Sequence, residues 1–452
     1  MNAVAQFFKE SHTVCTLESE AKTGSRATFT MTDVDFNMMP VDKMRGRASR
    51  ATRAAAIEAA ATDSLTLSVH VSLDALEADW RRLEASNTIS LHQGFDWCKA
   101  WAKSHQNPLL LVRGNLGHKT IFILPLELVR GRLFRTARFI GAPHSNINTG
   151  LFSSDLGDLA SQDFAACVIK QLGEKLSRVA DIVTLEKMPF EWRGTCHPLA
   201  SLPAVRNQNA SYQLPLLENF ETTLAQINAK RRRKKFRVSE KRLEALGGYD
   251  HVVAKTSEER RALLDLFFAQ KAARFKVLGL PNVFQDPETQ AFFHRLAALG
   301  ETENGQPLEL NAIRLRGENE GRIIAIAGLS RKGDHVICQF GSIDEDIAAD
   351  SSPGELLFFL MIRRQCAEGA ALFDFGIGDQ PYKRSWCTVE TVQRDIVLPL
   401  TVRGRIAAWL HRSLVSMKSA IKKNRTLYAF VQRLRQRRQG TSAGASSEMD
   451  NG

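Results

Sequence analysis

The sequence contains no apolar run that approaches the roughly 20 residues needed to span a bilayer, and no apolar core of a secretory signal. Its seven cysteines include no Cys-x-x-Cys pair, and its eleven histidines show no metal-ligand spacing. These absences argue against a membrane-spanning protein, a disulfide framework and a zinc site. We therefore expect a cytoplasmic chain without a metal, whose cysteines are buried thiols in a reducing compartment.

Acidic residues are absent from 396 to 447, although the net charge of the whole chain is only +12. In this tail, apolar residues recur at helical spacing between basic ones, namely at Ile406, Leu410, Leu414, Met417 and Ile421. A basic amphipathic helix suits the anionic surface of the inner membrane face. A helix that packs on the second half of the protein with its basic side in water has the same pattern, so both interpretations stay open.

A second basic cluster fills residues 230–237, inside a helix expected from about Glu218 to Leu246 and closed by two glycines. Six consecutive basic residues cover the whole circumference of a helix, so some of them must lie against the protein and pair or snorkel. The cluster is either a positive rim over a cleft, attracting the phosphates of CoA, tRNA or a nucleotide-linked acceptor, or a solvated face.

The second half of the chain has a clear order of elements. A capping box at Thr256 and Glu259 predicts a helix to about Phe275, and Asp286-Pro287 predicts a second helix that ends near Gly300. Three β-rich runs with short polar turns follow and predict an antiparallel meander, at residues 308–316, 322–331 and 335–342.

The segment after the meander begins with Ser352-Pro353-Gly354-Glu355, which predicts a helix start with a Ser N-cap and Glu355 placed to close a capping box. Gly354 would let an anion such as a pyrophosphate approach the helix start closely, although the Glu355 carboxylate competes for the same N–H groups. An apolar, buried helix is expected to Ala367, followed by a strand from Leu372.

This order and its motifs resemble the CelD/BcsL branch of the GNAT acyltransferase superfamily, which is related to the FemABX peptidyltransferases. The residues that carry the resemblance are Ser352-Pro353-Gly354, Phe373-Asp374-Phe375, Gly378-Asp379, Tyr382-Lys383 and Trp386, and in the first half Phe95, Trp97, Trp101 and Leu124-Pro125-Leu126. The resemblance covers roughly residues 65–400.

The resemblance implies an α+β fold of two tandem GNAT-like lobes, each with a mixed, mostly antiparallel sheet flanked by helices. The length of 452 residues suits two cores. We expect a disordered leader or start-site artefact at 1–63, an N-terminal lobe at 64–215, a basic inter-lobe helix at 216–248, a C-terminal lobe with the donor site at 249–400, and a basic amphipathic helical tail with a disordered end at 401–452.

The same resemblance implies the catalytic candidates. Asp374 matches an aspartate that takes the proton of the acceptor, or it pairs structurally with Lys383 or Arg384. Gly376 stands where the related transferases have a glutamine. Lys383 is expected to stabilise an oxyanion or hold a phosphate. Asp379 either shares proton transfer or fixes the turn before Pro381, and Tyr382 either protonates the leaving thiolate or anchors that turn. Cys387 is a minor candidate for a thiolate.

The acyl donor is expected between the strands at 335–341 and 372–375, with its pyrophosphate at residues 352–355. The donor-binding candidates are Gln339, Gly341, Ser342, Ser352, Gly354, Glu355 and Leu356. Gln339 is also a candidate for orienting the acceptor. His335 either faces the acceptor or is an edge residue without a catalytic role.

Three functions follow as hypotheses. The first is an acetyl-CoA- or acyl-CoA-dependent N- or O-acyltransferase acting on a sugar, a polysaccharide precursor or a lipid-linked envelope acceptor. The second is an aminoacyl-tRNA-dependent FemABX-like transferase. The third is a non-catalytic binding component of a polysaccharide or cellulose biosynthesis machine.

Overall fold

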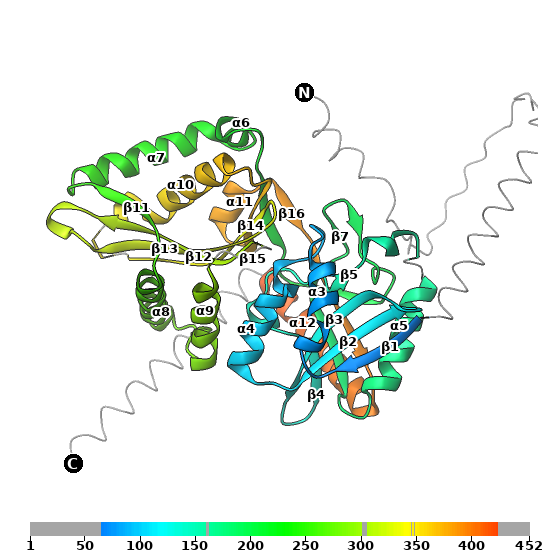
Figure 1. The fold of residues 1–452 in the computed structure, drawn as a ribbon. Coiled ribbons are helices and arrows are strands. Elements are labelled where there is room, and N and C mark those ends of the chain that lie inside the picture. The colour runs from blue at the N-terminus through cyan, green and yellow to red at the C-terminus, as the bar shows by residue number, and fades with distance from the viewer. Residues whose placement is uncertain (1–64, 160–161, 301–304, 345, 348, 424–452) are drawn as a thin grey trace, which may run out of the picture.

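The structure is a computed structural model that describes residues 65–423, apart from 160–161, 301–304, 345 and 348. The expected leader and the end of the tail lie outside these residues. The chain forms two lobes, each built on one large sheet (Figure 1). Among the described residues, no helix has both the length and the apolar character that crossing a bilayer requires.

The sheet of the N-terminal lobe has the order β1-β2-β3-β4-β6-β17-β9, with β5 paired to β3. Its strands are β1 (Leu65–His70), β2 (Leu109–Leu116), β3 (Lys119–Arg130), β4 (Arg135–Phe139), β5 (Leu151–Phe152), β6 (Ile182–Pro189), β9 (Ala204–Arg206) and β17 (Gln393–Pro399). A small hairpin, β7 (Glu191–Trp192) with β8 (Thr195–Cys196), stands apart from it. The helices of this lobe are α3 (Glu77–Glu84), α4 (Phe95–His105) and α5 (Gln162–Leu176).

The sheet of the C-terminal lobe has the order β11-β12-β13-β14-β15-β10-β16. Its strands are β10 (Ser211–Pro215), β11 (Tyr249–Val253), β12 (Gln306–Leu315), β13 (Ile323–Lys332), β14 (His335–Ile343), β15 (Leu372–Ile377) and β16 (Val389–Thr391). One face carries α6 (Phe220–Ala225), α7 (Ala229–Glu244), α10 (Pro353–Ala367) and α11 (Pro381–Trp386), and the other carries α8 (Ser257–Leu278) and α9 (Pro287–Leu299) (Figure 1).

Both lobes repeat one succession of elements. In the first, β2, β3 and β4 form an antiparallel meander, α5 follows, and β6 returns parallel to β4. In the second, β12, β13 and β14 form the meander, α10 follows, and β15 returns parallel to β14. The fold is therefore α+β with two tandem GNAT-like lobes, as the sequence predicts.

The two sheets exchange their outer strands, which differs from the expected domain boundaries. β10 lies within the expected N-terminal range of 64–215 but pairs with β15 of the C-terminal sheet. β17 lies within the expected C-terminal range of 249–400 but pairs with β6 of the N-terminal sheet. The boundaries differ because a strand joins the sheet whose free edge it reaches, and not the sheet nearest to it in sequence.

The helix starts that carry strong local signals agree with the sequence. Thr256 and Glu259 form the expected capping box of α8, and Pro287 is the first residue of α9. The helix expected from 218 to 246 is instead two helices, because Asn219 caps α6 and Asn228 caps α7 through their side chains.

The lobes share one apolar core. Trp97 and Trp101 on α4 meet the ring of Phe292 on α9 with centroids 4.9 and 5.0 Å apart. The same cluster of buried residues reaches Phe95 in the first lobe and Phe340 in the second. The aromatic residues that signalled the N-terminal lobe in the sequence therefore form the contact between the lobes.

Candidate functional site

The parallel pairing of β14 with β15 is short. It joins His335, Val336 and Ile337 to Leu372, Phe373 and Asp374, and no pairing of these strands is found beyond it. β15 pairs with β10 along its other edge as far as Ile377, whereas its pairing with β14 ends at Asp374, so β14 and β15 part after this residue. The sequence predicts the acyl donor at this place.

Asp374 is fully buried at the end of the pairing. Its Oδ1 accepts a hydrogen bond from the Gly376 N–H (2.6 Å), and its Oδ2 accepts one from Nε2 of Gln213 (3.0 Å). Neither Lys383 nor Arg384, the partners considered from the sequence, donates to it: Lys383 donates to the Ile377 carbonyl and Arg384 to Asp379. The carboxylate is held firmly on one face of the sheet.

His335 faces the same carboxylate. Its Nε2 lies 3.5 Å from Oδ2 of Asp374 and has no hydrogen-bond partner among the described residues. The ring is buried beside Trp192, with centroids 5.4 Å apart. The structure therefore places His335 against Asp374, and both alternatives from the sequence, a residue facing the acceptor or an edge residue, stay open.

The first lobe reaches into the place where the strands part. Asn146 donates from Nδ2 to Oε1 of Gln339 on β14 (3.3 Å), and its Oδ1 accepts from the Ile377 N–H on β15 (3.4 Å). Gly376 permits this approach, because it has φ +74° and a Cβ added there would lie 2.9 Å from Oδ1 of Asn146. The amide of Asn146 thus occupies the space of a side chain at position 376.

A buried histidine supports the same bridge. Nε2 of His92 lies 3.2 Å from Oε1 of Gln339, and burial lowers the pKa of His92 to about 4. His92 is therefore neutral near pH 7 and can act as a hydrogen-bonding partner without bringing charge. Gln339 is thus engaged with the first lobe, while its Nε2 has no partner among the described residues.

Lys383 and Tyr382 lie across β15 from this cluster. Nζ of the buried Lys383 donates to the Ile377 carbonyl (2.6 Å), and burial lowers its pKa. The Tyr382 ring stacks on Phe358, and burial raises the pKa of its hydroxyl. A lysine with a lowered pKa is a better proton donor than an exposed one.

Two other candidates are not part of this group. Asp379 forms an ion pair with Arg384 near the surface, with Oδ2 2.9 Å from Nη2. Burial raises the pKa of Cys387, which disfavours the thiolate that a nucleophilic cysteine needs. The expected turn at 381–386 is the short helix α11.

The start of α10 differs from the expected N-cap. Ser352 has φ +54° and its side chain makes no cap hydrogen bond. The N–H groups of Glu355 and Leu356 already donate to the Ser352 carbonyl, and the Leu356 side chain lies in the core. These bonds do not use the Gly354 N–H.

Glu355 does not close a capping box, so that part of the prediction is wrong. Its carboxylate accepts hydrogen bonds from Arg232 (2.5 Å) and Lys235 (3.1 Å) on α7 and from the Trp386 indole (3.2 Å). The Arg232 guanidinium lies 4.2 Å from the Trp386 ring centroid and also donates to the Ser385 carbonyl. These contacts turn Glu355 away from the helix start and remove the expected competition with an anion.

The basic cluster of α7 therefore has two kinds of members. Arg232 is buried, and Lys235 is paired with Glu355. Some of the six basic residues therefore lie against the protein and pair, as the sequence predicts. The others are exposed, namely Lys230, Arg231, Arg233, Lys234 and Arg237. α7 packs along α10, and Arg242 donates to the Asp350 carbonyl just before the start of α10. Positive charge thus lies beside the expected pyrophosphate position.

Gly341 and Ser342 stand near the end of β14. Ser342 donates to Oε1 of Gln270 on α8 (2.6 Å), so its hydroxyl is turned away from α10. A Cβ on Gly341 would lie 3.2 Å from the Ile326 carbonyl oxygen. The structure brings together His335, Gln339 and Asp374 from the sequence-derived set, but not Ser342 or Asp379.

The equivalent place in the first lobe is filled by its own chain. Nζ of Lys187 donates to the carbonyls of Ala142 (2.6 Å) and Ser145 (2.8 Å), which lie on the loop after β4. On the same loop, the Asn148 N–H donates a hydrogen bond to the Lys187 carbonyl. This internal bonding leaves the second lobe as the better candidate for the donor.

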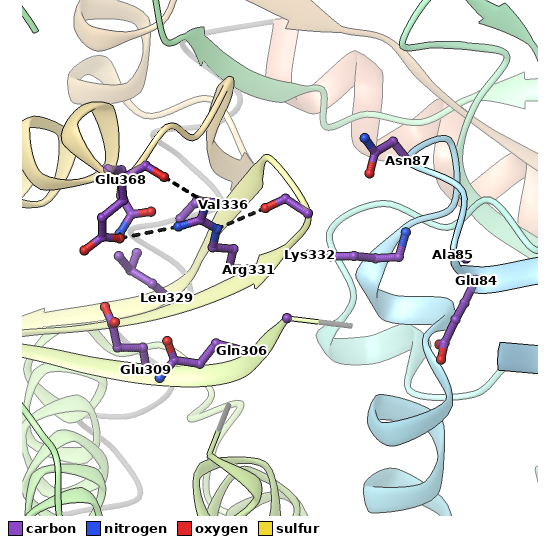
Figure 2. Close-up of a pocket in the computed structure, with 13 residues that line it drawn as sticks. Glu84, Ala85, Asn87, Gln306, Glu309, Leu329, Arg331, Lys332, Val336 and Glu368 are labelled. Atoms are coloured by element: carbon purple, nitrogen blue, oxygen red, sulfur yellow. Dashed lines mark hydrogen bonds and ion pairs between the residues drawn. The ribbon is translucent and has the colours of Figure 1, made fainter. Parts of the chain in front are cut away.

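A polar cleft of about 640 Å³ opens between the lobes at the other end of β14. Figure 2 shows Lys332 extending from the β13–β14 hairpin toward the first lobe, where its Nζ donates to the Ser86 carbonyl (2.6 Å), and Arg331 bonded to Glu368. None of the sequence-derived site residues lines this cleft. No group of three or more His, Cys, Asp or Glu suited to a metal is found among the described residues.

Residues 230–384 match a family model described as "Acetyltransferase (GNAT) domain". No curated protein matches the chain. Among solved structures, FemX is 12% identical with a TM-score of 0.52, over 74% of this chain and 97% of FemX. The C-terminal domain of a putative lysylphosphatidylglycerol synthetase from Agrobacterium fabrum is also 12% identical, with a TM-score of 0.47 over 76% of this chain and 97% of that one.

A tandem GNAT protein from the clavulanic acid biosynthesis pathway is 11% identical, with a TM-score of 0.39 over 73% of this chain and 98% of that one. Identities this low describe the fold and leave the reaction open. The succession of strands and helices, the parting of β14 from β15 and the match over 230–384 agree with one another. Residues 230–384 are therefore similar to a GNAT acetyltransferase domain, within a fold similar to that of FemX.

Proposed function

We propose that this protein is an acyl-CoA-dependent N- or O-acyltransferase whose donor lies between β14 and β15 of the second lobe. The observation that carries the proposal is the buried His335–Asp374 pair at the point where these strands part. The start of α10, with Gly354 and the basic residues of α7 nearby, supports the donor phosphates beyond the end of β14 that lies opposite His335, in the direction in which the two strands part.

In the proposed reaction, the acceptor amine or hydroxyl attacks the thioester carbonyl, and the C–S bond breaks as the new C–N or C–O bond forms. His335 takes the acceptor proton, and Asp374, fixed by Gln213 and the Gly376 N–H, stabilises the imidazolium. Lys383 stabilises the oxyanion or supplies a proton to the leaving thiolate. In this proposal Asp374 acts through His335, since both of its oxygens already accept hydrogen bonds.

The proposed acceptor is a sugar, a polysaccharide precursor or a lipid-linked envelope precursor. The motifs shared with the CelD/BcsL type support this class, and the polar cleft beside Lys332 and Arg331 supports a hydrophilic acceptor. Acetyl-CoA is the proposed donor, with longer acyl-CoAs as alternatives. Aminoacyl-tRNA remains the second candidate donor, because the exposed basic residues of α7 suit any polyphosphate.

The first test is donor binding by the full chain, followed as a change in melting temperature. Acetyl-CoA and free CoA should raise it, since they bind the folded state. Stabilisation by tRNA with a steep salt dependence, and none by CoA, would replace the acyl-CoA proposal with the tRNA one.

The second test is release of free CoA thiol with amino sugars, nucleotide sugars and lipid-linked sugars as acceptors. Asp374→Asn, His335→Gln and Lys383→Met should each lower turnover by about 100-fold or more while acetyl-CoA still raises the melting temperature. Asp250→Asn, which alters an exposed ion pair on the far strand β11, should match the unchanged protein. Full turnover in Asp374→Asn would remove the proposed site.

A further inference from the structure

Helix α12 (Val402–Lys423) lies on β6 and β17 of the first lobe. Gly404, Ala407 and Ala408 are the buried residues of its described part, and the two alanines pack with Ile182 and Val397. A Cβ on Gly404 would lie 1.8 Å from the Asp181 carbonyl oxygen, so the helix backbone approaches the sheet closely here. The helix is thus attached by its small side chains.

The opposite side of α12 is apolar and exposed. Its described residues are Val402, Ile406, Trp409, Leu410 and Leu414, with exposed fractions of 73, 53, 66, 36 and 50%. The first four follow the spacing i, i+4, i+7 and i+8, which places them on one face. The interpretation that this stripe packs on the second lobe is wrong, because α12 lies on β6 and β17 of the first lobe and leaves Ile406, Leu410 and Leu414 exposed.

Trp409 marks this face. The chain has six tryptophans, and the other five are buried. Tryptophan and leucine beside arginine are the side chains of helices that lie in a membrane interface, where the ring sits at the level of the lipid headgroups. An exposed row of this kind needs a partner, because contiguous apolar patches mark interaction surfaces.

The positive charge of α12 indicates which kind of partner covers its apolar face. Arg403, Arg405 and Arg412 are exposed along the same helix, and no acidic residue occurs from 396 to 447. An anionic bilayer offers an apolar interior for the exposed apolar side chains of α12 and negative headgroups for its arginines. The surface of a protein partner offers this combination less readily.

We propose that α12 binds flat to an anionic lipid surface, with Val402, Ile406, Trp409 and Leu410 inserted and the arginines at the headgroups. Gly404, Ala407 and Ala408 hold the first lobe directly above the bilayer. This inference stands apart from the acyl-transfer proposal, since it concerns binding only.

Vesicles test it with the full chain, because acrylamide quenches the exposed Trp409 in preference to the five buried tryptophans. With vesicles of phosphatidylcholine and phosphatidylglycerol in equal parts, emission should shift to the blue and acrylamide quenching should fall. Phosphatidylcholine alone should bind at least tenfold more weakly, and each Arg→Gln change at 403, 405 or 412 should weaken partitioning by about fivefold.

Ile406→Ser combined with Trp409→Ser should abolish pelleting with the mixed vesicles, and Val71→Ser, at a 77% exposed apolar residue of the first lobe, is the matched control. Circular dichroism and melting temperature identify any variant that fails to fold, and Trp409→Phe, which keeps an aromatic ring, should still pellet. Absence of pelleting by the unchanged chain overturns the proposal. So does quench protection of Trp409 without vesicles, which would mean that the rest of the tail or a second copy covers the face.

Discussion

Gly376 and Gly369 have nearly the same backbone angle, φ +74° and +73°, in very different surroundings. A Cβ on Gly369 would meet no atom within 4 Å, whereas one on Gly376 would lie 2.9 Å from Oδ1 of Asn146. Gly369→Ala should therefore cost about 1 to 2 kcal/mol of unfolding free energy for the backbone alone. Gly376→Ala should cost at least about 1 kcal/mol more, because Asn146 must also move.

Urea unfolding of the two variants side by side measures this difference. Gly376→Ala should also lower turnover without changing the donor-induced rise in melting temperature, since Asn146 bridges Gln339 and the Ile377 N–H. Equal losses in the two variants would mean that the bridge contributes nothing to stability.

Two buried histidines predict acid sensitivity. Burial lowers the pKa of His92 and of His197 to about 4, below the usual value near 6.5. Between these values the unfolded chain binds protons that the folded chain does not, so stability is complete above pH 6.5 and is lost as the pH falls toward 4. Each histidine contributes up to about 1.4 kcal/mol per pH unit in this window.

Melting temperatures from pH 7.5 to 4.5 give the measurement, and His197→Gln should reduce the slope between pH 6.5 and 4.5. His118, which lies in a β-turn rather than the core, serves as the comparison through His118→Gln. The prediction fails if the two variants have the same slope.

At the level of single residues, the sequence predicts those residues of the candidate site that lie in continuous motifs. Asp374 and Lys383, which follow β14 and α10 in the chain, are examples. It does not predict Gln213, His92 or Asn146, because these come from segments distant in sequence and meet β14 and β15 only in the fold. One signal for Gln213 was present, a polar residue inside an apolar run, since such a residue needs a partner when buried.

Among the elements, α7 and α10 are joined by a buried ion pair. The Arg232 side chain is 1% exposed, and its main anionic partner is Glu355. Glu355→Gln should cost about 3 to 5 kcal/mol of unfolding free energy, because it leaves the guanidinium buried without a countercharge. Arg233 and Glu221 offer the control, since both are exposed and Arg233→Gln should cost at most about 1 kcal/mol.

Denaturant unfolding of both variants measures these two changes in the free energy of unfolding. The double variant Arg232→Met with Glu355→Gln should regain part of the stability that Glu355→Gln loses. A small effect of Glu355→Gln alone would mean that water replaces the carboxylate.

The elements themselves follow the sequence where local chemistry specifies an end. Thr256 with Glu259 and Pro287 predict their helix starts because each supplies its own cap or backbone angle. Ser352 fails as an N-cap because its backbone adopts the left-handed region and its hydroxyl makes no cap bond, which depends on the chain before it. Glu355 fails as a capping residue because a distant arginine competes for it.

For the molecule as a whole, the shared core predicts one unfolding unit. Phe292 on α9 is fully buried in the core that the lobes share, in contact with Trp97 and Trp101 of the first lobe. Phe292→Ala should cost about 3 to 5 kcal/mol and lower a single calorimetric transition. Two transitions, with one unmoved by the substitution, would show that the lobes unfold independently.

The exchange of β10 and β17 could not be predicted from the sequence. Both runs are short, and nothing in five to seven residues specifies which of two similar sheets they join. The choice is made by long-range pairing, which depends on the free edges of β15 and β6.

This exchange also constrains how the protein forms during synthesis. Multidomain chains usually fold from the N-terminus, one unit at a time. Here the sheet of the first lobe cannot close until Gln393–Pro399 has left the ribosome, and α12, which lies on β6 and β17, comes later still. The sheet of the first lobe is thus completed after that of the second, and the exposed apolar face of α12 forms only once this sheet has its last strand.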